Sequence, residues 1–148
     1  TCPNGDTAIY AAASNGHLEV AALLLGHGAD QIIRYGNGRW TPMTCAAING
    51  DVAMTRLLME HWPEGIHQPN GLGQTPVWLA GSSNREAAEL VRMLLVAGCD
   101  PSIRDESVRV TAVGMARSCH HKACVRVFKV GCSSRPPIMS GGGGGRRR

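Results

Sequence analysis

Apolar residues near the start of the chain fall into two short segments with helical spacing. Ile9, Ala12 and Ala13 form a small apolar face within residues 7–14. Asn15-Gly16 then ends this helix, because glycine tolerates the left-handed conformation that a helix end requires. Residues 17–27 are predicted to form a second helix, with apolar positions at Leu18, Val20, Ala21, Leu24 and Leu25. Two antiparallel helices, followed after Gly28 by a turn and an extended stretch at 31–34, make one structural unit.

The same pattern returns three times along the chain. Its most regular position is a threonine, at Thr7, Thr41, Thr75 and Thr111, with separations of 34, 34 and 36 residues. Each threonine is followed by Pro or Ala and then by an aliphatic residue or Met. Five positions after each threonine comes an alanine, at Ala12, Ala46, Ala80 and Ala116. A fixed period of this length indicates a chain built from stacked repeats.

The first unit resembles the ankyrin repeat almost position by position. The residues that carry the resemblance are Gly5-Asp6-Thr7, Ala11-Ala12, residues 15–20 (Asn-Gly-His-Leu-Glu-Val), Leu23-Leu24-Leu25 and Gly28-Ala29-Asp30. The later units are looser, but they keep the threonine, the alanine and an apolar stripe, which is Leu57-Leu58-Met59, Met93-Leu94-Leu95 or Val127-Phe128. The second unit also keeps Asn49-Gly50-Asp51, and the third has Gly98-Cys99-Asp100. The resemblance implies an all-α repeat solenoid with turn connections over residues 1–130. Its expected repeats span about 3–34, 35–68, 69–104 and 105–130.

One departure from the family leaves two interpretations open. The family usually has a histidine two residues after the proline, and here Tyr10, Thr44, Trp78 and Gly114 occupy those places. Either the repeats stack without the histidine, or Trp78 or Tyr10 belongs to a contact surface.

The ends of the chain differ in character. The helices of the first repeat are among the most apolar, although a terminal repeat needs a polar outer face. We therefore expect further repeats or a capping helix upstream. The last helix carries Lys122, Arg126 and Lys129 on one stripe, which suits a C-terminal cap. Residues 131–148, with five consecutive glycines and three arginines, are too polar to form a core and are expected to be disordered.

The charge distribution and the cysteine content bear on the possible partners of the protein and on its location. The net charge of +4 is unevenly distributed, since residues 104–148 carry 10 basic and 2 acidic side chains. This basic end could contact nucleic acid or acidic protein, although stacking aromatics are scarce there. The 6 cysteines show no framework spacing, which favours a reducing, intracellular location, cytoplasmic rather than nuclear. No apolar run reaches the length of a membrane span.

Motifs for catalysis and for cofactor binding are weak or missing. Gly36-Asn37-Gly38 could begin a dinucleotide fingerprint, but no third glycine follows and a turn is the better interpretation. Cys119, His120, His121, Cys124 and Cys132 are metal-ligand types without a paired-cysteine spacing. Cys124 is expected on the buried face of the last helix. We therefore predict no catalytic activity, no metal and no cofactor.

The resemblance implies a protein-interaction module that uses turn tips and inner-helix ends. Trp40 is the first candidate, because a large aromatic at a polar tip suits a binding hot spot, although it could instead pack on an adjacent tip. The other candidates are Asn37, Arg39, Leu72 and Gln74 at the tips, and Ser14, Asn15, Ile48, Asn49, Ser82 and Ser83 at the inner-helix ends. An alternative function is substrate recruitment or targeting for a larger enzyme, such as a ubiquitin ligase or a kinase. The sequence does not identify the partner.

Overall fold

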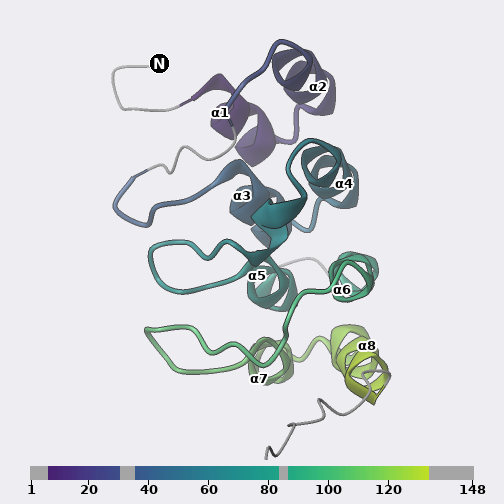
Figure 1. Ribbon diagram of the computed structural model, residues 1–148. Helices are drawn as coiled ribbons and strands as arrows, with labels where there is room; N and C mark the ends of the chain where they lie inside the picture. Colours follow the sequence, from purple (N-terminus) through teal and green to yellow (C-terminus); the bar gives the residue numbers. More distant parts are fainter. Residues whose placement is uncertain (1–6, 31–35, 84–86, 134–148) are drawn as a thin grey trace, which may run out of the picture.

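A computed structural model describes residues 7–30, 36–83 and 87–133, and its helices follow one another in pairs (Figure 1). Within the described residues there are eight α-helices and one 3-10 helix, with no strand beyond an isolated bridge between Arg104 and Thr111. The pairs are α1 (Ala8–Asn15) with α2 (Leu18–Gly26), α3 (Pro42–Ile48) with α4 (Val52–His61), α5 (Pro76–Ser82) with α6 (Ala88–Val96), and α7 (Ala112–Ser118) with α8 (Lys122–Ser133).

The helices form two layers. The inner helices α1, α3, α5 and α7 stack in one column, and the outer helices α2, α4, α6 and α8 stack in a second column beside it (Figure 1). Long turns project from the inner column on the side away from the outer helices. This arrangement confirms the all-α repeat solenoid that the period predicted.

The recurrent threonine is the N-cap of each inner helix. The hydroxyl oxygens of Thr7, Thr41, Thr75 and Thr111 accept hydrogen bonds from the backbone N–H three residues later. Each bond satisfies an N–H that has no partner within its helix. At Thr41 the bond is reciprocal, because the Thr44 hydroxyl also accepts from the Thr41 N–H at 2.8 Å. The sequence signal therefore marks where each repeat restarts.

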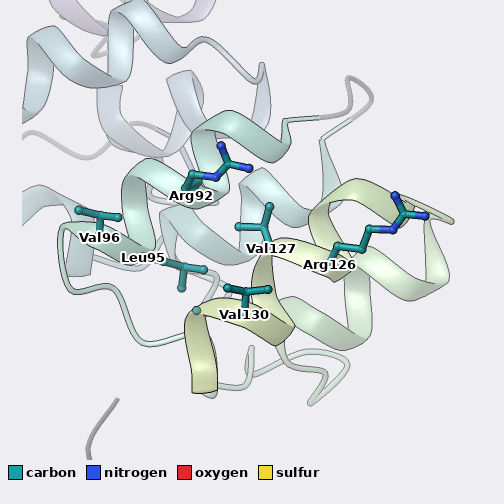
Figure 2. A pocket seen from close by; sticks show the side chains of 7 residues that line it. Arg92, Leu95, Val96, Arg126, Val127 and Val130 are labelled. Carbon is teal, nitrogen blue, oxygen red and sulfur yellow. The ribbon is translucent and has the colours of Figure 1, made fainter. Parts of the chain in front are cut away.

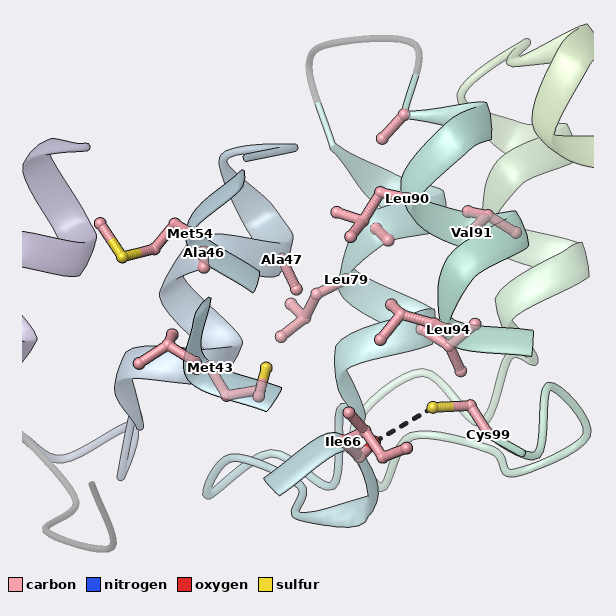
Figure 3. Packing of buried hydrophobic residues seen from close by; sticks show 14 of the residues in the cluster. Met43, Ala46, Ala47, Met54, Ile66, Leu79, Leu90, Val91, Leu94 and Cys99 are labelled. Atoms are coloured by element: carbon pink, nitrogen blue, oxygen red, sulfur yellow. Dashed lines mark hydrogen bonds between the residues drawn. The ribbon is translucent and has the colours of Figure 1, made fainter. Parts of the chain in front are cut away.

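Small residues let the inner helices approach closely. Ala12, Ala46, Ala80 and Ala116 are all buried, and with larger side chains from both layers they form one core. Figure 3 shows its centre, where Leu79 of α5 lies between α3 and α6. Close packing of this kind suits the high alanine content.

Trp78 belongs to the core. The residue is 5% exposed, and its Nε1 donates a 2.8 Å hydrogen bond to the carbonyl oxygen of Val110 in the next turn. Trp78 thus connects α5 to the fourth repeat and does not belong to a contact surface. Tyr10, at the equivalent position, is half-buried on α1.

Two segments differ from the simplest repeat. The 3-10 helix η1 (Pro63–His67) follows α4, where the first repeat has Gly28-Ala29-Asp30. A Cβ atom at Gly65 would clash with the ring of Trp62, so the glycine lets this ring cover the short helix. At the C-terminal end, α8 continues to Ser133, past the expected boundary at residue 130. The rest of the expected disordered tail, 134–148, lies outside the described residues.

Candidate functional site

The projecting turns are organised by buried polar side chains at their bases. Asn70 is 3% exposed, and its Oδ1 accepts hydrogen bonds from the backbone N–H groups of Leu72 and Gln74, each at 3.0 Å. Its Nδ2 donates to the Gln74 side chain. The amide of Asn70 therefore fixes the turn between the second and third repeats.

Asp105 has the equivalent role in the turn between the third and fourth repeats. Its carboxylate is 2% exposed and accepts hydrogen bonds from the Ser107 hydroxyl and from the N–H groups of Val108 and Val110. Burial acts to raise the pKa of this carboxyl group, but these hydrogen bonds favour the charged form more strongly. The pKa of Asp105 consequently lies below its usual value.

Neighbouring turns are connected to each other through their backbones. The Gly71 N–H donates to the carbonyl oxygen of Gly38 at 2.7 Å, and the Glu106 N–H donates to the carbonyl oxygen of Leu72 at 3.0 Å. Three turns from three repeats thus form one continuous surface, which we call the tip row: residues 36–40, 71–74 and 106–110.

The tip row carries two arginines in a conformation that disfavours side chains. The residue two positions before the capping threonine has positive φ in three repeats: Arg39 at 47°, Gly73 at 75° and Arg109 at 55°. Left-handed backbone costs roughly 1–2 kcal/mol for a residue other than glycine. Glycine is found at this position in the third repeat, so the fold does not require arginine there. Such strain is typical of functional positions.

Exposed apolar side chains lie beside these arginines. Leu72 is 43% exposed and Val108 is 58% exposed. Trp40 is half-buried, and its indole lies against Gly38 of its own turn, where a Cβ atom would clash with it. Trp40 thus has a packing neighbour within its own repeat, and its role in binding stays a prediction.

A second group of predicted residues lines a polar cleft. The cleft lies at the C-terminal ends of α1, α3 and α5 and has a volume of about 320 Å³. Five of the predicted residues line it: Ser14, Asn15, Ile48, Asn49 and Ser83. The Asn49 Nδ2 donates to the Ser14 carbonyl oxygen at 2.9 Å across two repeats. Ser82 is not among the residues that line the cleft, and its hydroxyl donates to the Leu79 carbonyl oxygen at 2.9 Å.

The structure thus divides the sequence-predicted residues into two places. Asn37, Arg39, Trp40, Leu72 and Gln74 lie along the tip row, and the cleft lies one inner-helix length away, roughly 11 Å. Sequence reasoning missed Val108 and Arg109 on the tip row and Gly16 and Asp51 in the cleft. Counting back from Thr111 in the repeat register would have located Arg109.

The cysteines and histidines of the last repeat have separate structural roles. Cys124 is fully buried, as predicted from the repeat register. His121 Nδ1 lies 3.1 Å from the Gly81 carbonyl oxygen, and Cys119 Sγ lies 3.7 Å from Met115 Sδ. Among the described residues, no group of three or more His, Cys, Asp or Glu side chains could hold a metal ion. The side chain of Cys132 lies outside what the structure describes.

The thiols of Cys45 and Cys99 are unreactive near neutral pH. Burial raises the pKa of Cys99 to about 12. It also raises the pKa of Cys45 to about 11, despite a hydrogen bond with Tyr10 that acts the other way. Because the thiolate is the reactive form, neither group is a nucleophile near neutral pH. Both side chains act as small apolar groups in the core.

The basic stripe of α8 is on the surface. Lys122, Arg126 and Lys129 are exposed, as the sequence predicted for a final helix. A nucleic-acid contact at this end stays an untested alternative, and the cellular compartment stays a prediction. Over the stretches of chain that the structure describes, every helix is too short or too polar to cross a membrane.

Comparison with known proteins agrees with this architecture. A family model for ankyrin repeats, in three copies, matches residues 1–69 and 30–105. The E3 ubiquitin-protein ligase KEG of Arabidopsis thaliana is 29% identical over 134 residues, covering 84% of this chain and 8% of the ligase. The chain therefore spans only a small fraction of that relative. With the family match over most of its length and with its stacked helix pairs, the chain belongs to the ankyrin-repeat family.

Proposed function

We propose that this chain is a non-catalytic protein-interaction module that binds its partner through the tip row. Ankyrin repeats generally serve in protein interaction and typically lack catalytic activity, which supports the proposal at the level of the family. The observation that carries it here is the pair of backbone hydrogen bonds that join the tips, from Gly71 to Gly38 and from Glu106 to Leu72. A partner would meet one preformed surface and would not need to order three separate turns, which lowers the cost of binding.

The side chains of the tip row suit recognition. Leu72 and Val108 offer exposed apolar area, and Arg39 and Arg109 stand beside them on strained backbone. Arginine is enriched among the residues that supply most of the binding energy in interfaces. The exposed aliphatic area of Leu72 and Val108 would add stabilisation by burial. The polar cleft at Asn49 would add hydrogen bonds at the other end of the inner helices.

The test compares proteins captured from a cell extract by three forms of the full chain. Leu72→Asp with Val108→Asp alters the tip row, whereas Leu23→Asp places a negative charge on α2, where the native side chain is 67% exposed. Specific partners of the tip row, measured by quantitative mass spectrometry, should be lost with the tip variant and kept with the α2 variant.

Binding of one captured partner is then measured by calorimetry. We expect the tip variant to weaken it by at least about 2 kcal/mol, with unchanged thermal unfolding. If partners survive the tip substitutions, the tip row is not the binding surface.

A second candidate function is recruitment for an enzyme that lies elsewhere in a longer protein. The observation that favours it is the similarity to a short segment of an E3 ubiquitin-protein ligase. If the full-length protein carries a ligase domain, deleting the repeats should remove modification of specific substrates and leave self-modification intact. Loss of both would place the repeats in the catalytic machinery.

A further inference from the structure

An apolar groove lies on the outer layer, away from the tip row. Its lining comes from α6 and α8 and comprises Arg92, Leu95, Val96, Arg126, Val127, Val130 and Gly131, with a volume of about 410 Å³. Figure 2 shows Leu95, Val127 and Val130 between the two helices and Val96 at the side of α6 away from α8. Arg92 lies above them, and the Arg126 side chain extends outward from α8 on the other side.

Two aliphatic side chains that line the groove are largely exposed. Val96 is 85% exposed and Val130 is 70% exposed, the two largest values among the exposed large hydrophobic side chains described. Gly131 lies so close to Leu95 that a Cβ atom there would be 2.8 Å from Leu95 Cδ1. The glycine lets the end of α8 settle against α6, with Val130 left at the rim. A contiguous apolar patch with a polar rim is typical of an interaction site.

The charge around the groove is positive. Arg92 and Arg126 line it, and α8 carries Lys122, Arg126 and Lys129 and no acidic residue. The one acidic side chain of α6, Glu89, lines neighbouring grooves and not this one. Within the described residues, neither Arg92 nor Arg126 has a hydrogen bond or an ion pair with another side chain. Both guanidinium groups are thus available for carboxylates, which they can bind through two parallel hydrogen bonds.

We propose that this groove binds an amphipathic helix of a partner protein, with apolar residues on one face and acidic residues on both flanks. The apolar residues would cover Leu95, Val96 and Val127, and the flanking carboxylates would pair with Arg92 and Arg126. Helix-in-groove recognition uses apolar residues at positions i, i+3, i+4 and i+7. The site is independent of the tip row, so one chain could hold two partners at once.

The same charges disfavour two other occupants. A second copy of the chain would bring the basic α8 against another basic α8. Residues 134–148 contain four arginines and no acidic residue, so their charge also repels the groove. Complementary charge therefore favours an acidic partner.

The test uses a fluorescent peptide of about 14 residues, capped at both ends. Four leucines occupy i, i+3, i+4 and i+7, and Glu and Ala fill the other positions. A control peptide has Lys in place of Glu. Fluorescence anisotropy with the full chain should show saturable binding of the acidic peptide only. Equal binding of both peptides, or none up to roughly 1 mM, would overturn the proposal.

Variants of the full chain locate the binding site. Arg126→Glu and Val96→Asp should each weaken acidic-peptide binding about tenfold or more. The matched control Lys122→Glu changes the same charge on the same helix, at an exposed side chain that does not line this groove, and should stay within about twofold. If Lys122→Glu and Arg126→Glu weaken binding equally, the attraction is nonspecific and the groove is not the site.

Two measurements would detect the alternative occupants of the groove, a second copy of the chain or its own C-terminal segment. Concentration-dependent association of the chain in analytical ultracentrifugation, abolished by Val96→Asp, would assign the groove to a second copy. Tighter peptide binding after Ile138→Asp would assign it to the chain's own C-terminal segment. Either result would replace the acidic partner. Thermal unfolding of each variant checks that the fold is unchanged.

Discussion

Single buried polar residues set the shape of the tip row. Asn70 and Asp105 lie at the bases of successive turns, and each accepts hydrogen bonds from partly buried backbone N–H groups of its own turn. Leaving such a group unsatisfied costs about 1–3 kcal/mol. Both residues accept backbone hydrogen bonds, but only Asp105 carries a charge. Of these two turns, only the one that Asp105 organises should therefore have a stability that depends on the protonation of its central side chain.

Replacing Asp105 by Asn should lower stability by about 1–3 kcal/mol near neutral pH, because one oxygen becomes an NH2 group and loses its donors. The pKa of Asp105 is depressed in the folded state, so its contribution is full above the unfolded value of about 4 and disappears as pH falls through the folded value. The difference between wild type and variant in urea unfolding should therefore shrink below about pH 4.

The exposed neighbour provides the control for this substitution. Glu106→Gln removes a carboxylate that lies on the surface, so it should leave the unfolding free energy within about 0.5 kcal/mol of wild type. A stability difference for Asp105→Asn that does not change with pH would show that the carboxylate charge is unimportant.

The elements of this fold begin where threonine caps them. Four inner helices begin directly after a threonine whose hydroxyl accepts from the N–H three residues on. Thr111, the cap of the last repeat, is half-buried and accepts from Gly114 at 3.2 Å. A substitution at Thr111 therefore tests the cap with little disturbance of the core.

Thr111→Val should cost about 1 kcal/mol, because the isosteric side chain keeps its packing and loses the hydrogen bond. Thr111→Ser keeps the hydroxyl and should cost less than half as much. Urea unfolding gives both values, and hydrogen exchange at the Gly114 amide should accelerate in the valine variant. Equal costs for Val and Ser would assign the effect to packing.

The repeat pattern predicted the helices because their ends depend on local chemistry. Residues 7–14 and 17–27 correspond to α1 and α2 with differences of one residue at each end. The place of Trp78 was not predictable from local pattern, since it depends on the Val110 carbonyl group 32 positions away. The tip row likewise depends on contacts between repeats, such as Gly71 with Gly38. The predicted tip residues were placed together, but their link to one another required the structure.

At the scale of the whole molecule, the two ends of the outer layer are unlike. On α8 the exposed stripe is basic, whereas α2 exposes Val20 and Leu23 at 49% and 67%. Stacked repeats gain stability mainly from the interfaces between neighbours. The surface of α2 therefore has the character of an interface that another repeat could cover.

Fusing a capping ankyrin repeat with a polar outer face to the N-terminal end should raise the free energy of unfolding by about 2–4 kcal/mol. Burying the exposed portions of two side chains of this size, Val20 and Leu23, supplies gains of this order. Urea unfolding of the fused and unfused chains measures the difference. In the control, Leu23→Glu should remove most of the gain from the fusion, because burying an unpaired carboxylate opposes docking. A fusion that leaves the midpoint unchanged would mean that the α2 surface is already a working end of the array, and its apolar residues would then need another explanation.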